Sequence, residues 1–258
     1  MTVFTRAILR TPSSNFADGL TTAELGAPDV ETALTQHREY ARALERCGLA
    51  LTILPPDPRF PDSCFVEDTA VLCGSTAIVT RPGAASRTGE VEEMRGRLAE
   101  LFPSVRAIEP PGTLDGGDVC EADSRFFIGV SERTNEAGAR QLANFLDAEG
   151  KSATLVDIRD TPGILHLKSG VTSIGDGRLV AIGALAENAA FSDFQVLTVA
   201  SGEEYAANCV RVNDHVLVAA GFPRLESSLE SLGYPVTTVP MSEFRKMDGG
   251  LSCLSLRF

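Results

Sequence analysis

The sequence predicts an α/β protein, a five-bladed α/β propeller in which hairpin-plus-helix units form a closed ring. Three observations predict it. Helical patterns alternate with short β-rich runs along all 258 residues. Four strand–turn–strand segments resemble one another, and a helix usually lies between them. The two ends of the chain each supply half of a fifth copy. A doubly wound α/β sheet is the competing architecture.

The repeated unit can be read directly from the chain. Its copies are EDTAVLCGSTAIVTRPG from Glu67, GDVCEADSRFFIGVS from Gly117, SGVTSIGDGRLVAIG from Ser169 and ANCVRVNDHVLVAAG from Ala207. The turn pairs GS, DS, DG and ND are typical of hairpins. The final segment, LSCLSLRF, is a half-copy that contains only the first strand of the unit. The N-terminal segment MTVFTRAILRTP can supply the second strand. Such a ring would leave no sheet edge exposed.

Five helices are expected between the strands. Apolar residues at helical spacing mark the first, Gly48 follows it as a C-cap, and Asn135 is the N-cap of the third. The predicted segments are Asp29–Cys47, Glu90–Leu101, Asn135–Ala148, Glu187–Asp193 and Pro223–Leu232. No linker rich in proline, serine or charge divides the chain, so residues 1–258 are expected to form one catalytic domain.

Composition narrows the function. The net charge of −12 argues against nucleic acid and anionic membranes as partners, and is compatible with a small cationic substrate. No apolar run is long enough to span a membrane, and the N-terminal residues lack a signal peptide's apolar stretch. A cytoplasmic protein with six reduced cysteines is therefore expected. Neither a cofactor nor a metal is predicted.

Three residues at unit starts are candidates for nucleophilic catalysis, because a propeller brings unit starts together near its axis. Cys253 follows a Gly-Gly pair that permits close approach of backbone to ligand, whereas the other five cysteines are interpreted as core residues. His166 could act as general acid and base. Asp115, in LDGGDV, could orient that imidazole, and Asp118 competes for this role.

Charged residues near these starts suggest a pocket for a planar cation. Asp62, Glu67 and Asp68 lie beside apolar Phe65 in FPDSCFVEDT, and their carboxylates could bind a cation by bidentate hydrogen bonds. Two arginines that follow second strands, Arg87 and Arg133, could bind a carboxylate or could be surface charges that flank helices. The segment from Ser13 to Pro28 contains Gly19 and Gly26 and could form a lid or an inert surface loop.

Taken together, the motifs resemble the dimethylarginine dimethylaminohydrolases of the guanidine-modifying pentein superfamily. The matching stretches are DGLT, LPPDPRFPDSCFVEDTAVL, IVTRPGAASR, PGTLDGGDV, RTNEAGARQL, HLKSGV, YAANCV and RKMDGGLSCLSLRF. The resemblance implies hydrolysis of Nω-methylated arginines to citrulline, with a small-molecule substrate and a covalent cysteine intermediate. It implies that Cys253 is the nucleophile, His166 the acid and base, and Asp115 the acid beside it. It also places these residues around the substrate: Leu20, Asp62, Phe65, Glu67, Asp68, Arg87, Arg133 and Met247.

Two other functions compete with this one. An arginine deiminase would use the same nucleophile with ammonia as leaving group, but such chains are usually longer and carry a helical insertion not found here. A non-catalytic propeller that acts as a binding protein would have no need of a cysteine, a histidine and an acid at converging unit starts. The sequence is compatible with a monomer or a homodimer, and with adventitious inhibition by zinc.

Overall fold

The computed structural model describes residues 3–258, so Met1 and Thr2, which belong to the expected N-terminal strand, lie outside the described residues. The chain divides into two compact units, each described by itself. The middle unit is Glu67–Ser169. The terminal unit contains the residues up to Val66 together with Gly170–Phe258. Whether the chain behaves as the single domain expected from its sequence stays a prediction.

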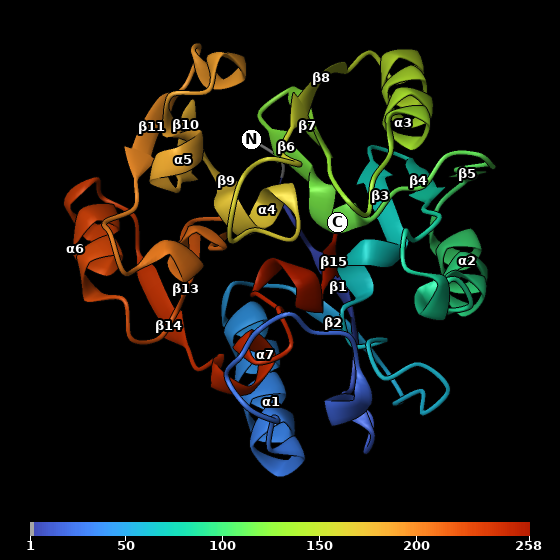
Figure 1. Ribbon diagram of the computed structural model, residues 1–258, viewed down its shortest axis with the longest axis horizontal. Coiled ribbons are helices and arrows are strands. Elements are labelled where there is room, and N and C mark those ends of the chain that lie inside the picture. The colour runs from blue at the N-terminus through green and yellow to red at the C-terminus, as the bar shows by residue number, and fades with distance from the viewer. Residues whose placement is uncertain (1–2) are drawn as a thin grey trace. The chain divides into compact units, whose positions relative to one another are not determined.

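Five three-stranded sheets make up the described part of the chain (Figure 1). In every sheet, the central strand pairs antiparallel with one neighbour and parallel with the other. The middle unit holds two of these sheets. They consist of β3 (Ala70–Cys73), β4 (Thr76–Val79) and β5 (Ser104–Ala107), and of β6 (Val119–Ala122), β7 (Arg125–Val130) and β8 (Ser152–Asp157). Helices α2 (Glu90–Leu101) and α3 (Glu136–Ala148) connect β4 to β5 and β7 to β8.

The terminal unit holds the other three sheets. Their strands are β1 (Arg6–Arg10), β2 (Ala50–Leu54) and β15 (Leu256–Arg257); β9 (Val171–Gly175), β10 (Arg178–Ala181) and β11 (Gln195–Thr198); and β12 (Val210–Val212), β13 (His215–Ala219) and β14 (Val236–Val239). The helices of this unit are α1 (Val30–Arg46), α5 (Gly183–Ala186), α6 (Pro223–Ser231) and α7 (Ser242–Arg245), and α4 (Leu167–Gly170) lies where the two units meet in sequence.

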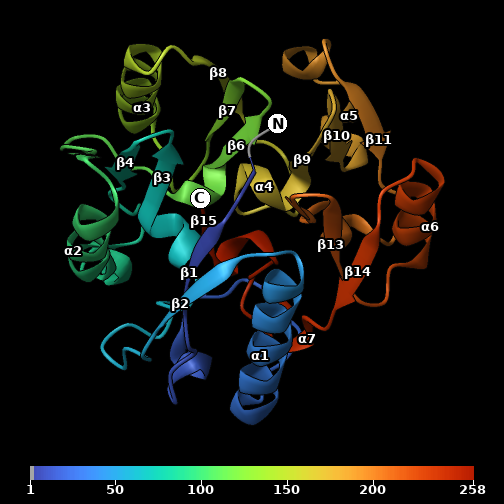
Figure 2. The same ribbon diagram turned by 180° about the vertical axis from the view of Figure 1, so that it is seen from behind.

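The two ends of the chain share one sheet, as the half-copies predict. Strand β15 pairs antiparallel with β1, with Ile8 opposite Leu256, and β1 runs parallel to β2 (Figure 2). The last strand is therefore held by the first. This pairing fixes the segment that follows Cys253, because only two residues separate that cysteine from β15.

Hairpin turns lie where the sequence predicts them. The first turn residue has a positive φ in all four copies, a conformation that glycine, asparagine and aspartate adopt most readily. These residues are Gly74, Asp123, Asp176 and Asn213. The turn chemistry therefore explains the register of each hairpin.

Four of the five expected helices are confirmed. Helix α1 begins after Asp29, whose side chain accepts a hydrogen bond from the Thr32 N–H. Helix α3 begins after Asn135, whose side chain accepts a hydrogen bond from the Gly138 N–H in the same way. The expectation for Glu187–Asp193 is wrong. That stretch holds only a 3-10 turn, Ala189–Phe191, after the short helix α5. The Asn188 side chain accepts a hydrogen bond from the Ala190 N–H there, and such a local hydrogen bond favours a short turn over an α-helix.

The sequence reading also missed the third strand of four sheets. These strands, β5, β8, β11 and β14, run parallel to the central strand after each helix. All are edge strands of four to six residues with mostly half-buried or exposed side chains. Edge strands therefore lack the clear alternation that identifies a strand in sequence.

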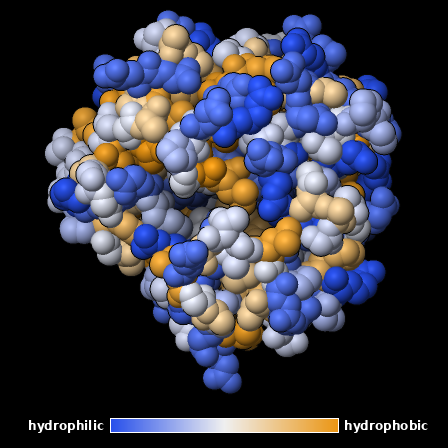
Figure 3. All heavy atoms as spheres, viewed as in Figure 1, coloured by the Kyte–Doolittle hydropathy of each residue, from blue (hydrophilic) through white to orange (hydrophobic). Residues whose placement is uncertain are grey.

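Apolar side chains from both sheets of the middle unit form one core with α3. Val71 and Ile78 of the first sheet, Phe126 and Ile128 of the second, and Leu142 of the helix belong to it. Each fully buried side chain of this size contributes about 1.5–3 kcal/mol. On the face in Figure 3, hydrophilic residues surround smaller hydrophobic areas. None of the helices within residues 3–258 is both long and apolar enough to cross a membrane.

Candidate active site

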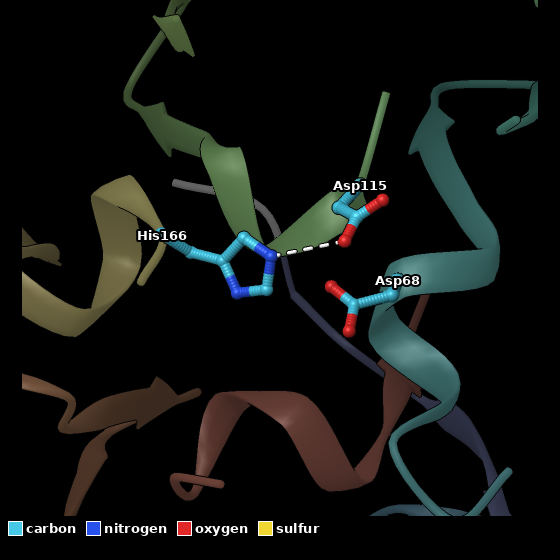
Figure 4. A group of neighbouring side chains, drawn as sticks. All are labelled: Asp68, Asp115 and His166. Carbon is cyan, nitrogen blue, oxygen red and sulfur yellow. Dashed lines mark hydrogen bonds and ion pairs between the residues drawn. The ribbon is translucent and has the colours of Figure 1, made fainter. Parts of the chain in front are cut away.

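Three predicted site residues of the middle unit lie together. Asp68, Asp115 and His166 are buried, and one ligand atom from each lies within 4.8 Å of the others (Figure 4). Asp68 belongs to the turn before β3, Asp115 precedes the turn before β6, and His166 precedes α4 and β9. Each residue therefore stands just before the first strand of its repeat copy. Within this unit, the expected convergence of unit starts is confirmed.

The glycine pair of LDGGDV makes room for this cluster. The Gly117 N–H donates to Asp68 Oδ1 at 2.9 Å. A Cβ at Gly117 would lie 2.8 Å from His166 Nδ1 and 2.9 Å from Asp68 Oδ1, closer than carbon approaches these atoms in folded proteins. Gly116 likewise faces the Glu67 carbonyl. The backbone thus approaches the side chains directly, which glycine alone permits.

Asp115, rather than Asp118, holds the imidazole. His166 Nε2 lies 3.0 Å from Asp115 Oδ2, whose other oxygen accepts the Gly83 N–H at 2.8 Å. Asp118 accepts the Leu167 N–H at 2.9 Å and the Ser131 hydroxyl at 2.6 Å. Asp115 orients the ring, and Asp118 anchors the backbone beside it. This decides the choice that the sequence left open.

Surrounding carboxylates favour the protonated imidazole. Burial by itself would lower the pKa of His166. The charges of Asp68 and Asp118, with the Asp115 hydrogen bond, outweigh burial and raise this pKa to about 9. Asp68 behaves conversely: burial raises its pKa, but the positive charges of His166 and Arg87 lower it to about 2. At neutral pH the imidazole of His166 is therefore protonated.

The basic residues around the cluster bind carboxylates of the protein itself. Buried Arg87 donates to Asp68 Oδ2 at 2.5 Å and, with two nitrogens, to Glu90 at 2.8 and 3.0 Å. Lys168 lies 2.6 Å from Glu67. Sequence reasoning missed Glu90 and Lys168, although the Arg87–Glu90 spacing of three residues is a signal for such a pair.

Arg133 remains partly accessible. Its Nη1 lies 4.0 Å from Asp115 Oδ2, and its side chain is 18% exposed. Of the two arginines expected to bind a carboxylate, Arg133 is therefore the less occupied by the protein's own acids. The direct role of either arginine toward a ligand stays a prediction.

The spacing of Asp68, Asp115 and His166 would allow a metal ion, but their bonding does not favour one. Asp68 already accepts from Arg87 and Gly117, and Asp115 accepts from His166 and Gly83. A cation would compete with the Arg87 guanidinium and with the protonated imidazole. The expectation that catalysis needs no metal stays a prediction.

In the terminal unit, the glycine pair before Cys253 lies against two side chains. A Cβ at Gly249 would overlap the Phe65 ring, and one at Gly250 would overlap the Asn208 amide. Cys253 itself lies in a 3-10 turn, Ser252–Leu254, and is half-buried. The other five cysteines are buried, as expected of core residues. Cys253 is thus the thiol that a reagent or substrate can reach most readily.

Asp62 and Met247 lie against the middle of the predicted lid, at Gly19 and Leu20. The Leu20 N–H lies 3.1 and 3.2 Å from the two carboxylate oxygens of Asp62. Gly19 lies against Asp62 and the Met247 methyl group, so a side chain there would displace both. Leu20 is 41% exposed, while Asp62 and Met247 are buried. These three predicted site residues are therefore neighbours.

Two further contacts tie the lid segment to the residues before Cys253. Thr22 donates its N–H to Asp248 Oδ2 at 2.5 Å, and the Thr21 hydroxyl donates to the Lys246 carbonyl at 2.8 Å. Phe65, predicted to line the pocket, packs its ring 6.3 Å from that of Phe244. In this structure the predicted lid segment is therefore held against the residues that precede Cys253.

Comparison with known proteins identifies the family. The chain is 44% identical over 257 residues to N(G),N(G)-dimethylarginine dimethylaminohydrolase of Pseudomonas aeruginosa, covering 99% of this chain and all of the relative. It is 35% identical to the enzyme of the same name from Streptomyces coelicolor, covering 98% and 96%. The chain belongs to the dimethylarginine dimethylaminohydrolase family. No family model matches it.

Solved structures of dimethylarginine dimethylaminohydrolase support the same assignment. A cysteine-to-serine mutant of the Pseudomonas aeruginosa enzyme, complexed with citrulline, superimposes with a TM-score of 0.96 at 44% identity over the full length of both chains. The N-terminal domain of the arginine dihydrolase ArgZ matches at 0.88 with 19% identity, covering 98% and 97% of the chains, a likeness of fold alone. The predicted α/β-propeller fold class is confirmed.

The site residues of this dimethylarginine dimethylaminohydrolase homologue fall into both units. Asp68, Asp115 and His166 belong to the middle unit, and Cys253 with Leu20 and Asp62 belongs to the terminal unit. Each group is ordered by its own hydrogen bonds. Convergence of Cys253 with His166, and the catalytic and binding roles assigned above, stay predictions.

Proposed function

We propose that this protein hydrolyses Nω-methylated L-arginines, namely asymmetric dimethylarginine and monomethylarginine, to L-citrulline and dimethylamine or methylamine. Family membership over almost the whole chain carries the proposal. The buried His166–Asp115 pair and the half-buried Cys253 supply the acid, its orienting group and a nucleophile. The two relatives are named dimethylarginine dimethylaminohydrolase, and a solved structure of that enzyme is complexed with citrulline.

In the first half-reaction, the Cys253 thiolate attacks the guanidinium carbon and a carbon–sulfur bond forms. His166, protonated at neutral pH because its pKa is about 9, gives its proton to the methylated nitrogen. The carbon–nitrogen bond then breaks and the neutral amine leaves. A thiouronium remains on Cys253. Asp115 keeps the imidazole oriented throughout, because it accepts the Nε2–H hydrogen bond.

In the second half-reaction, the now neutral His166 takes a proton from water as the hydroxide adds to the thiouronium carbon. The carbon–sulfur bond breaks, the thiolate returns, and the product loses its remaining proton to solvent as citrulline. Cys253 is again a thiolate and His166 is again protonated. One water molecule is consumed for each amine released.

Substrate recognition is assigned to the acidic and arginine residues. Asp68, Glu67 and Asp62 supply carboxylates for the substrate's cationic groups, and the partly accessible Arg133 binds its carboxylate. Arg87 acts chiefly by holding Asp68. Leu20, Phe65 and Met247 supply apolar and backbone contacts beside Asp62. A monomeric or homodimeric state and a cytoplasmic location also belong to this proposal.

A citrulline-release assay with asymmetric dimethylarginine, monomethylarginine and arginine in parallel tests the function. Turnover of the methylated substrates is expected, and turnover of arginine alone would instead identify a deiminase. Cys253→Ser is expected to abolish turnover while substrate binding remains measurable. A fully active Cys253→Ser variant would refute the nucleophile. Failure of an arginine-like electrophile to label Cys253 would favour a non-catalytic binding protein.

A further inference from the structure

Asn208 lies immediately beside the residues that carry the candidate nucleophile. It precedes β12 and is buried, and its amide forms two hydrogen bonds to Ser252. The side-chain Oδ1 accepts the Ser252 backbone N–H at 2.9 Å, and Nδ2 donates to Ser252 Oγ at 3.0 Å. One side chain thus holds both the backbone and the side chain of the residue before Cys253.

The pair Gly249-Gly250 leaves room for the contact between Asn208 and Ser252. A Cβ at Gly250 would overlap the carbonyl oxygen and carbon of the Asn208 side chain. The Tyr205 hydroxyl, from the same turn-rich segment as Asn208, donates to the Gly249 carbonyl at 2.7 Å. Two polar side chains of the segment Tyr205–Asn208 therefore form hydrogen bonds to two residues that closely precede the cysteine, Gly249 and Ser252.

We infer that Asn208 is a positioning residue for the Cys253 thiol, acting through Ser252. The 3-10 turn Ser252–Leu254 is only three residues long, and the Cys253 N–H makes a long backbone hydrogen bond, to the Gly250 carbonyl at 3.3 Å. Asn208 adds hydrogen bonds from a neighbouring repeat copy, 44 residues earlier in the chain. Displacement of a reacting atom by about 1 Å can cost roughly 100-fold in rate. The amide therefore sets the direction of attack.

The experiment compares Asn208→Ala with wild type in two assays. Because the inference deepens the proposed function, steady-state citrulline release is one of them. A positioning role predicts that kcat falls about 10- to 100-fold while KM changes less than about 3-fold. The second assay needs no substrate: the rate at which iodoacetamide alkylates Cys253 is followed against pH by peptide mass spectrometry. The alkylation rate of the variant is expected to differ several-fold from that of wild type across the pH range, because the sulfur is no longer held in one orientation.

Asn213→Ala is the matched control. Asn213 belongs to the same unit, and its amide also forms backbone hydrogen bonds, to Phe4 and Cys47, but at the hairpin turn between β12 and β13. Its loss should lower stability while kcat and the alkylation profile of Cys253 stay at wild-type values. A decrease in kcat shared equally by the two variants would overturn the inference.

Ser252→Ala keeps the proposal falsifiable if Asn208→Ala does not fold. It removes only the Oγ partner and keeps the bond from the Ser252 N–H, so a smaller decrease in kcat is expected. When both variants fold, the double variant should be no slower than Asn208→Ala, because both changes act through one contact. Additive losses, or an unchanged alkylation profile in Asn208→Ala, would contradict the inference. If wild type releases no citrulline, the proposed function fails while the alkylation assay still decides the role of Asn208.

Discussion

Arg87 and Asp68 form a buried ion pair, with Nη1 2.5 Å from Oδ2 and both side chains at most 5% exposed. Glu90 completes the arrangement from the first turn of α2. Removing one partner from such a network leaves an uncompensated charge in the interior. The pair therefore serves stability as well as the position of the carboxylate next to His166.

Substituting Arg87→Ala should lower the free energy of unfolding by about 3–5 kcal/mol, because Asp68 and Glu90 then lose their buried counter-charge. Urea unfolding followed by circular dichroism measures this loss. Arg97→Ala is the control, since Arg97 makes an exposed pair with Glu100 at 3.5 Å and should cost less than about 1 kcal/mol. Equal losses in the two variants would contradict the assignment.

Stability should fall as pH rises from about 6.5 to about 9. The folded-state pKa of His166 is raised to about 9 from 6.5, so the folded protein holds this proton more tightly than the unfolded chain. The stabilisation is complete below pH 6.5 and is lost through pH 9. Its size is about 3 kcal/mol. Unfolding free energies measured at intervals across this range test it, and His166→Gln should remove most of the slope.

Neutralising Asp118 should lower the pKa of His166, because Asp118 is one of the charges that raise it. Proton NMR of the three histidines in Asp118→Asn measures the titration directly, with His37 and His215 as internal references. Asp157→Asn is the control, because Asp157 is exposed and pairs with Arg159. A His166 titration unchanged in Asp118→Asn would show that the electrostatic coupling is absent.

Gly117→Ala should disrupt the cluster, whereas Gly96→Ala should stabilise the protein. A methyl group at Gly117 meets His166 and Asp68, so activity should be lost and stability lowered by about 1–3 kcal/mol. Gly96 lies in α2 with nothing within 4 Å of its added methyl, and the change there should add about 0.5–1 kcal/mol. Thermal unfolding and citrulline release together check both variants. Retained activity in Gly117→Ala would argue against the close approach.

Local structure was predictable from the sequence because its causes are local. Helix α2 matches its expected bounds, and Asp29 and Asn135 cap α1 and α3 through bonds to residues three positions on. Turn pairs predicted the hairpins for the same reason. The half-copy at the C-terminus predicted the pairing of β15 with β1, since a repeat shows which strand is missing.

By itself, then, the sequence determined the repeat, the hairpins, most helices and the family. Only the tertiary structure decided which acid holds His166 and which acids bind Arg87. It also decided that Asn208 forms hydrogen bonds to Ser252. Asp115 and His166 are 51 residues apart, and Asn208 and Ser252 are 44 apart. Periodicity and capping act within a few turns, whereas such pairs are chosen by the packing of whole repeat copies. That choice is a property of the folded chain.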